Sequence, residues 1–333
     1  MSRLTVSRRY VLISPCREEV DYIQTTIDSI VNQSLLPAKW VIVDDGSTDG
    51  TQDVIAAAAA AHDFIEVVER SDRGKRSVGP GVIEAFYAGY DAINPDEYDY
   101  LCKLDVDLNI PPTYFETLLD RMEANPRIGT CSGKPYFPGK DGELVSERCG
   151  DENSVGMIKL YRTTCFQAIG GFVRAVMWDG IDGHRCRMLG WIACSWDEPE
   201  LRFIHLRPMG SSQKSIFTGR ARHGSGQYFM GTGLSYMLAS AAYRMLVPPY
   251  VIGGGMMLYG YLEAMAKRRS RYGDDHHDLA FRQFLRTYQW QCLLQGKQAA
   301  TQALNDQQAQ VWNDRYDGIN DGSSQSQKSL SVV

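Results

Sequence analysis

The sequence predicts an α/β fold, a doubly wound and mostly parallel sheet, followed by a helical C-terminal region. Short runs rich in β-branched residues alternate with amphipathic stretches through the first hundred residues. This alternation is typical of parallel sheets that helices cover on both faces. After about Pro111 the alternation weakens, and glycine-rich and uncharged stretches take its place. Ligands of such sheets bind where the strands end, so we expect the chemistry at the carboxyl edge.

The predicted strands of the first half are the apolar runs Tyr10–Ser14, Trp40–Asp44, Phe64–Glu69 and Tyr100–Val106. The predicted helices between them are Val20–Gln33, Thr51–His62 and Gly81–Ile93. In the first of these helices Ile23, Ile27 and Ile30 recur at helical spacing, which predicts a face packed on the sheet.

The second half is predicted with less regular elements. We expect helices at Pro112–Asn125, Thr163–Ile169, Ile181–Leu189 and Leu279–Leu294, strands at Gly129–Pro135 and Arg202–His205, and loops or hairpins over 136–156. The chain is thus divided into a domain of 1–206 with halves 9–107 and 108–206, a mobile loop 207–228, a helical and apolar region 229–312, and a disordered tail 313–333.

Composition narrows the function. Hydrophobic residues make up 44% of the 333 residues and charged residues 23%, as in ordinary globular proteins. The net charge of −5 argues against nucleic acid as a partner, because that partner needs a basic surface. The eight cysteines form no CxxC pair, and the N-terminal apolar run is too short for a signal peptide. We therefore expect a cytoplasmic protein.

Acidic residues follow two of the predicted strands. Asp44 and Asp45 end the second strand, within VIVDDGSTDGT, where carboxylates can accept hydrogen bonds from a ribose or a base. The plainer alternative is a strand end that caps the next helix. Asp105 and Asp107 end the fourth strand two residues apart, so they should point to one place and bind Mg²⁺ or Mn²⁺.

Several motifs in order resemble family 2 glycosyltransferases of the nucleotide-diphospho-sugar (GT-A) fold. They are Ser14–Glu19 (SPCREE), VIVDDGSTDGT, LDVD ending at Asp107, Cys165–Phe172 (CFQAIGGF) and Trp178–Asp182 before Gly190. The resemblance covers roughly residues 9–210. It implies a Rossmann-like domain that transfers a sugar from a nucleotide-diphosphate donor, a UDP-sugar, to a hydroxyl acceptor with inversion.

The resemblance also implies residue roles. Pro15, Glu19 and Asp45 should line the base and ribose pocket, with Asp44 sharing that role. Asp105 should contact the ribose or the sugar of the donor. Asp107 should hold the divalent metal ion. Lys75 is a further candidate for binding the nucleotide sugar.

The general base is expected in the Trp178–Asp182 element. In the family this acid lies eleven residues before a glycine, which selects Asp179 before Gly190. Tryptophan stands where the family has glutamate, so Asp182 remains a rival base. Either residue can instead cap the helix that follows.

Downstream residues have two interpretations each. His205, after a predicted strand, completes the metal shell or is a structural histidine. Arg220 and Arg222 either belong to a lid that closes over the diphosphate or lie in an exposed basic loop.

The apolar stretch 229–262 raises the question of a membrane. It contains Arg244 as its one charge, includes Pro248-Pro249 and Gly253–Gly255, and precedes the basic cluster of Lys267, Arg268, Arg269 and Arg271. Three interpretations stay open: an interfacial or re-entrant element, a buried core or oligomer contact, and a true span. Prolines and glycines inside it should break a regular helix.

The expected activity is thus that of a metal-dependent hexosyltransferase in extracellular polysaccharide or glycolipid synthesis. Its acceptor would be a glycan or a lipid-linked glycan, and its place the cytoplasmic face of the membrane. Two rivals remain. A sugar nucleotidyltransferase shares the wound sheet, although residues 15–19 lack its glycine-rich loop. A non-catalytic subunit of a polysaccharide synthase would not need the clustered acids.

Overall fold

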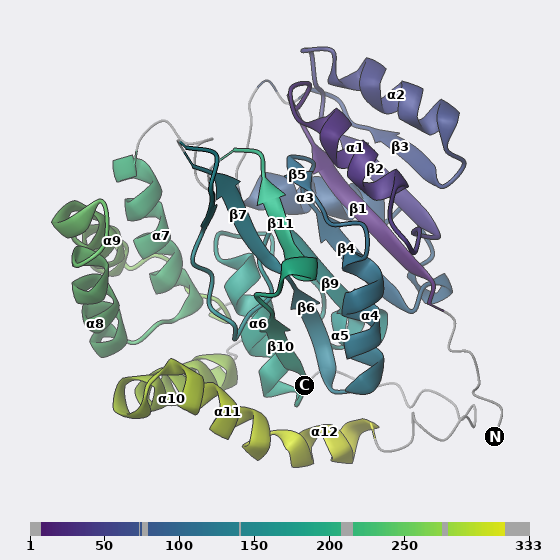
Figure 1. Ribbon diagram of the computed structural model, residues 1–333. Helices are drawn as coiled ribbons and strands as arrows, with labels where there is room; N and C mark the ends of the chain where they lie inside the picture. Colours follow the sequence, from purple (N-terminus) through teal and green to yellow (C-terminus); the bar gives the residue numbers. More distant parts are fainter. Residues whose placement is uncertain are drawn as a thin grey trace.

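The computed structural model describes residues 8–72, 74, 79–139, 141–207, 216–274 and 279–316. Lys75 and the tail from residue 317 lie outside these ranges. Figure 1 shows a central sheet with helices on both sides and a separate layer of C-terminal helices beside and below it. This arrangement confirms the predicted α/β class with a helical C-terminal region.

The main sheet has seven strands in the order β10-β6-β9-β4-β1-β2-β3. Their bounds are β1 Tyr10–Cys16, β2 Lys39–Asp44, β3 Ile65–Glu69, β4 Tyr100–Leu104, β6 Ile128–Ser132, β9 Ile158–Arg162 and β10 Ile192–Ser195. All pairs are parallel except that β9 runs antiparallel to both β4 and β6. The sheet is therefore mostly parallel, as predicted, but β9 and β10 were not predicted, and the buried Lys159 of β9 is paired with Asp182 of a distant segment.

A second sheet of four strands has the order β5-β11-β7-β8. Its strands are β5 Leu108–Asn109, β7 Lys134–Pro138, β8 Leu144–Ser146 and β11 Arg202–His205. Of the loops or hairpins predicted over 136–156, a hairpin is present, since β7 and β8 pair antiparallel. This sheet carries His205 at the end of β11 to the place where β5 follows the fourth strand of the main sheet.

Helices cover both faces of the main sheet. On one face lie α1 (Ile23–Val31), α2 (Thr51–Ala61) and α4 (Tyr114–Ala124), and on the other α3 (Pro80–Tyr90), α5 (Thr163–Ala168) and α6 (Trp178–Met188). Gly89 lets α3 approach the sheet closely, because a Cβ there would lie 2.8 Å from side-chain atoms of Ile13 and Val43. Short 3₁₀ turns at Pro95–Glu97 and Pro199–Leu201 precede β4 and β11.

The C-terminal region consists of α7 (Ile216–Met230), α8 (Leu234–Met245), α9 (Tyr250–Ala266), α10 (Leu279–Gln295), α11 (Lys297–Gln307) and α12 (Ala309–Tyr316). Helix α7 occupies most of the stretch predicted as a mobile loop, because its small residues pack against α9. A Cβ on Gly224 would lie 1.8 Å from the carbonyl oxygen of Met257. Helix α12 extends to residue 316 into the predicted tail, because its Trp312 and Tyr316 pack on Trp191.

Helix α9 corrects another expectation. It runs through Gly253–Gly255 without a break, because Gly254 packs where a Cβ would lie 2.2 Å from the carbonyl oxygen of Ala241. The expected break at Pro248-Pro249 is confirmed, because α8 ends at Met245 before this cis bond and α9 begins at Tyr250 after it. Among the residues that the structure describes, none of the helices is both long and apolar enough to cross a membrane.

Candidate active site

The first acidic pair lies at the carboxyl edge, where β2 ends. Asp44 and Asp45 are both buried. Asp44 accepts hydrogen bonds from the backbone N–H and the hydroxyl of Ser47 and from the side-chain amide of Gln52. These bonds close the turn after β2, which is the structural role that the sequence offered as the alternative to ligand binding. Asp45 forms an ion pair with Arg70 at 2.8 Å. Asp45 is thus the carboxylate of this pair that the local turn leaves for other partners.

Three chain segments meet around Arg207. Its guanidinium forms an ion pair with Asp107 at 2.6 Å and with Glu19 at 2.5 Å. Glu19 follows β1, Asp107 precedes β5, and Arg207 follows β11, so the strand ends of both sheets converge here. Burial alone would raise the pKa of Asp107, but the hydrogen bond and charge of His205, together with Arg207, outweigh burial and lower it. Asp107 is therefore an anion held in a cationic setting.

His205 lies on the other side of Asp107. Its Nε2 is 3.4 Å from Oδ2 of Asp107, and its Nδ1 is 3.1 Å from Oε2 of Glu147. Burial opposes the charged form, yet hydrogen bonds to these two carboxylates raise the pKa of His205 to about 9. A carboxylate on the second ring nitrogen is the usual orientation device of metal-binding histidines.

These contacts decide whether a divalent ion fits. Within the described residues no group of three or more His, Cys, Asp or Glu side chains forms a ready-made metal site. Asp107 and His205 nevertheless present an oxygen and a nitrogen 3.4 Å apart, with Glu147 orienting the imidazole. An ion bound there would take the place of the proton on Nε2 and would fill its coordination sphere from diphosphate and water. Asp107 and His205 can therefore hold a divalent ion when a bound nucleotide supplies further ligands.

Asp105 faces a different cation. Strand β4 ends at Leu104, two residues before the predicted end, and Asp105 forms an ion pair with the buried Lys103. The same Lys103 donates a hydrogen bond of 2.9 Å to the carbonyl oxygen of Gly156. Asp105 and Asp107 therefore have different partners, although both lie beyond the end of β4.

The two candidate bases lie in very different surroundings. Asp179, in the first turn of α6, is exposed, and a Cβ on Gly156 would lie 3.2 Å from its Oδ2. Asp179 and Lys103 thus both lie close to Gly156. Asp182, one turn later, is 1% exposed. It forms an ion pair of 2.5 Å with Lys159 and accepts a hydrogen bond from Tyr161.

Asp182 is held as a structural group. Burial raises its pKa, and the ion pair with Lys159 opposes that rise. Since Lys159 is itself fully buried in the middle of β9, the pair neutralises two charges inside the domain. Of the two carboxylates, only that of Asp179 is exposed to solvent.

The predicted lid residues lie on α7. Arg220 and Arg222 are half-buried, and burial lowers the pKa of each. His223, which follows Arg222, has its pKa lowered to about 4, first by burial and then by Arg244. Within the described part of the chain, neither Arg220 nor Arg222 forms a hydrogen bond or ion pair with Asp107. Residues 208–215, which belong to the same predicted loop, lie outside the described residues.

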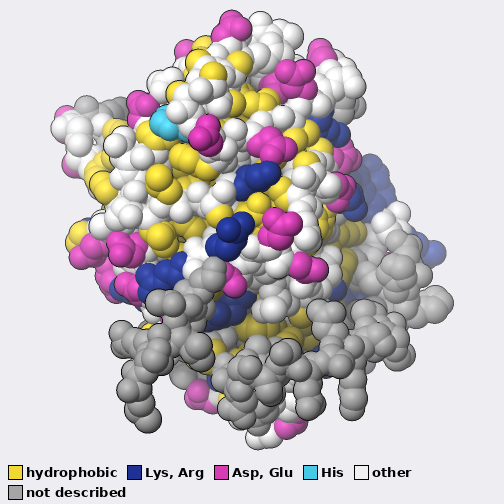
Figure 2. All heavy atoms as spheres, turned by 90° about the vertical axis from the view of Figure 1, so that its right-hand side faces the viewer, with side chains coloured by type: hydrophobic (Ala, Val, Ile, Leu, Met, Phe, Trp, Pro, Cys, Tyr) yellow, Lys and Arg dark blue, Asp and Glu magenta, His cyan; other side chains and the backbone are white. Residues whose placement is uncertain are grey.

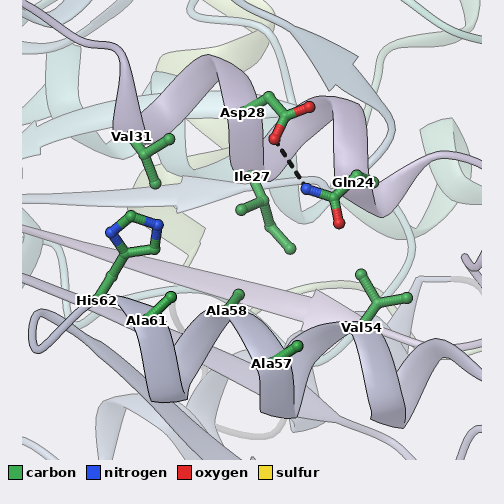
Figure 3. A pocket seen from close by; sticks show the side chains of 9 residues that line it. All are labelled: Gln24, Ile27, Asp28, Val31, Val54, Ala57, Ala58, Ala61 and His62. Atoms are coloured by element: carbon green, nitrogen blue, oxygen red, sulfur yellow. Dashed lines mark hydrogen bonds between the residues drawn. The ribbon is translucent and has the colours of Figure 1, made fainter.

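A groove elsewhere on the surface does not coincide with these acids. Figure 3 shows it between α1 and α2, with a volume of about 190 Å³. Its walls are mostly aliphatic, apart from Gln24, Asp28 and His62, and Gln24 donates a hydrogen bond of 2.8 Å to Asp28. No predicted site residue lines it.

Several partners in this site had no role in the sequence analysis. They are Lys103, Glu147, Lys159 and Arg207. Arg207 carried a usable signal, because it lies two residues after His205 and alternate residues of an extended chain share a side. Glu147 and Lys159 carried none, since their partners are 58 and 23 residues away along the chain.

Comparisons with known proteins agree with this architecture. Residues 11–174 match the model of glycosyl transferase family 2. The poly-beta-1,6-N-acetyl-D-glucosamine synthase of Staphylococcus epidermidis is 26% identical over 130 residues, which are 39% of this chain and 29% of that protein. The same enzyme of Staphylococcus aureus strain MSSA476 is 25% identical over 130 residues, again 39% of this chain and 29% of that protein. This chain thus spans less than a third of these relatives.

Among solved structures, GalNAc-T7 with UDP, GalNAc and Mn²⁺ superimposes with a TM-score of 0.50 and 11% identity, covering 82% of this chain and 56% of that chain. At this identity the likeness concerns the fold. The wound sheet with its strand-end acids thus has the GT-A fold, and the match assigns residues 11–174 of it to glycosyl transferase family 2.

Proposed function

We propose that this protein transfers a sugar from a nucleotide-diphosphate donor, a UDP-sugar, to a hydroxyl of a glycan or lipid-linked glycan, with inversion. The observation that carries the proposal is the meeting of Glu19, Asp107 and His205 around Arg207 at the carboxyl edge of the sheet. Nucleotides bind at that edge in wound α/β folds. The family assignment supports transferase chemistry, and the names of the curated relatives make N-acetylglucosamine the first donor sugar to test.

The donor side of the site binds and orients. Asp45, with Pro15 and Glu19, lines the base and ribose pocket, Asp44 shapes the turn beside it, and Asp105 contacts the ribose or sugar. Lys75 remains a further proposed donor contact, and Arg220 and Arg222 remain proposed contacts to the diphosphate, approaching from α7. The guanidinium of Arg207 has several N–H groups that can bind phosphate oxygens. The diphosphate of the nucleotide sugar would compete for them with Asp107 and Glu19.

Asp107 and His205 would hold Mg²⁺ or Mn²⁺, which, when bound, neutralises charge that develops on the departing diphosphate. The solved GalNAc-T7 structure with UDP and Mn²⁺ supports this choice of ion. The remaining step, removal of the proton from the acceptor hydroxyl, is assigned to Asp179. Its carboxylate accepts the proton of the acceptor hydroxyl as that oxygen attacks the anomeric carbon from the side opposite the diphosphate. One such displacement inverts the configuration, and no second carboxylate nucleophile is needed.

Asp179 is the preferred base because it is exposed and next to Gly156, whereas Asp182 is engaged by Lys159 and Tyr161. We further propose that the enzyme acts at the cytoplasmic face of a membrane, in polysaccharide or glycolipid synthesis, since the curated relatives are polysaccharide synthases.

The test is hydrolysis of a panel of nucleotide sugars by the purified chain with Mn²⁺. Slow release of sugar from one donor, abolished by EDTA, is the expected result. Exchange of pyrophosphate into the nucleotide sugar would instead identify a nucleotidyltransferase. If neither sugar release nor pyrophosphate exchange is detected, and a cooperative thermal unfolding transition shows that the protein is folded, the result would favour a non-catalytic subunit.

A further inference from the structure

Helices α8 and α9 present an exposed apolar surface that the proposed reaction does not use. Tyr243, Leu246, Tyr250 and Val251, around the turn between the helices, are 65%, 76%, 61% and 67% exposed. The surface continues along both helices through Leu234, Leu238, Ile252, Tyr259, Leu262 and Met265. So many exposed large apolar side chains on two packed helices are uncommon on a monomer and mark a contact with a partner or a membrane.

The exposure follows from how the helices pack. Helix α9 turns its small residues inward. A Cβ on Gly260 would lie 1.9 Å from the carbonyl oxygen of Ala221 in α7, and one on Gly254 would lie 2.2 Å from that of Ala241 in α8. With these glycines, Met257 and Tyr261 buried against the neighbouring helices, the other large apolar side chains of α9 remain on its outer face: Val251, Ile252, Tyr259, Leu262 and Met265. Figure 1 places α8 and α9 at the outer edge of the molecule, away from the main sheet.

The charge of this region is opposite to that of the whole chain. Residues 216–274 contain seven Lys and Arg residues and two Asp and Glu residues, whereas the full chain has a net charge of −5. Among the described residues, no ion pair joins Arg220, Arg222 or Arg244 to an acid. By contrast, the face in Figure 2, seen from the other side of the sheet, intersperses acidic and basic side chains with apolar ones.

The charge of this region distinguishes between two partners for the surface, a second copy of this protein and a membrane. A second copy of the same face would bring the two basic regions together, which repel each other. An anionic bilayer surface attracts them, with about 1 kcal/mol for each Lys or Arg near the headgroups. Tyrosines such as Tyr243, Tyr250 and Tyr259 suit the boundary between headgroups and acyl chains, where an apolar body and a polar tip are both accommodated.

We propose that the α8–α9 face docks flat on a membrane containing anionic lipids, with the apolar side chains in the headgroup–acyl boundary. Helix α7 connects this face to the active site. One side of α7 packs on α9 through Gly224, and another packs next to the α6 N-terminus, where a Cβ on Gly226 would lie 2.6 Å from Cγ of Met177. Asp179 follows two residues later in that segment.

Both α9 and α7 therefore lie between the docking face and the base, a thickness of roughly 20 Å. If Asp179 is the base, as in the proposed function, the acceptor is a glycan whose lipid anchor lies in the same bilayer. The membrane contact itself does not depend on that assignment.

The experiment measures sedimentation of the full chain with phosphatidylcholine vesicles, with and without phosphatidylglycerol. We expect binding to the mixed vesicles that high salt weakens, and little binding to phosphatidylcholine alone. The double variant Val251→Ser/Ile252→Ser should weaken binding about tenfold or more, because it removes apolar area from the boundary. The double variant Arg244→Glu/Arg268→Glu should weaken binding to mixed vesicles and leave binding to phosphatidylcholine unchanged.

The matched control is Trp290→Ser/Leu294→Ser on α10, which removes similarly exposed apolar side chains from a different face. The proposal is overturned if this control weakens binding as much, or if the unmodified chain does not bind mixed vesicles at low salt. It is also overturned if ultracentrifugation shows a dimer that Val251→Ser/Ile252→Ser converts to monomers. Hydrolysis of the donor in solution separates the two proposals, because it should be equal in all these variants, and its absence would count against the proposed function alone.

Discussion

Residues 9–107 and residues 216–274 handle charge in opposite ways. In the first region three acids at the strand ends each have a cation beside them: Arg70 for the buried Asp45, Lys103 for the partly exposed Asp105 and Arg207 for the buried Asp107. In the second region the basic residues outnumber the acids, and large apolar side chains remain exposed. In the first region the acids form ion pairs with cations of the same chain. In the second region, basic and apolar side chains remain exposed and can contact a partner outside the chain.

This difference indicates what each region recognises. Matched buried charges form a rigid polar site in which a ligand exchanges one set of ionic partners for another, as a diphosphate with its metal ion would. Unmatched charge beside apolar surface fits a broad interface rather than a small ligand. The predictions that follow test the comparison, beginning with the change of largest expected effect.

Asp107→Ala should abolish transfer, a loss of about 10³-fold or more, because it removes the carboxylate proposed for the metal ion. Nucleotide binding should lose its dependence on Mn²⁺, as calorimetry with and without EDTA would show. Asp28→Ala, which removes an exposed carboxylate of α1, is the matched control and should leave both unchanged. Normal transfer by Asp107→Ala in EDTA would contradict the metal role.

Asp179→Asn should lower single-turnover transfer by at least about 10²-fold, the usual scale for removing a general base, with donor affinity preserved. Asp182→Asn should act differently, because it leaves Lys159 buried without its counter-ion. Breaking a buried pair in this way costs about 3–5 kcal/mol of unfolding free energy. Thermal unfolding of both variants separates the roles. If Asp182→Asn is stable but inactive and Asp179→Asn is active, Asp182 is the base.

Arg207→Met should weaken donor binding about tenfold, because a charge-assisted contact to phosphate contributes roughly 1.5–3 kcal/mol, part of which is offset by the repulsion left between Glu19 and Asp107. Arg207→Lys should recover part of the affinity, since it keeps the charge but not the planar fork. Titration with UDP provides the measurement. Equal affinity in all three proteins would mean that Arg207 serves folding alone.

The smallest effect concerns pH. Because the pKa of His223 is lowered to about 4 in the folded protein, the unfolded chain binds a proton near pH 6.5 that the folded chain does not. Stability contributed by this residue is therefore present above about pH 6.5 and is lost as the pH falls toward about 4. His223→Gln should reduce the acid-side decline in the melting temperature. An identical decline in the variant would show that His223 does not contribute to it, leaving buried His184, whose pKa is also lowered, to account for it.

The sequence alone determined the features that depend on neighbouring residues. The apolar runs before Asp44 and before Asp105 predicted strands, and their order with the intervening helices predicted a wound sheet with acids at its edge. The helix near 279–294 followed from its periodicity. These features need only local backbone preferences and a consistent pattern of burial, which adjacent residues encode directly.

The tertiary structure alone decided what depends on distant partners. Lys159 looked unsuited to a buried strand until Asp182 was placed against it, and Arg207 gained its role only when Glu19 and Asp107 came to lie on either side. Gly254 looked like part of a break and Gly224 like part of a loop, yet these two glycines let α9 pack at backbone contact with α8 and α7. In each case the free energy comes from groups far apart in the chain, so no local pattern could reveal it.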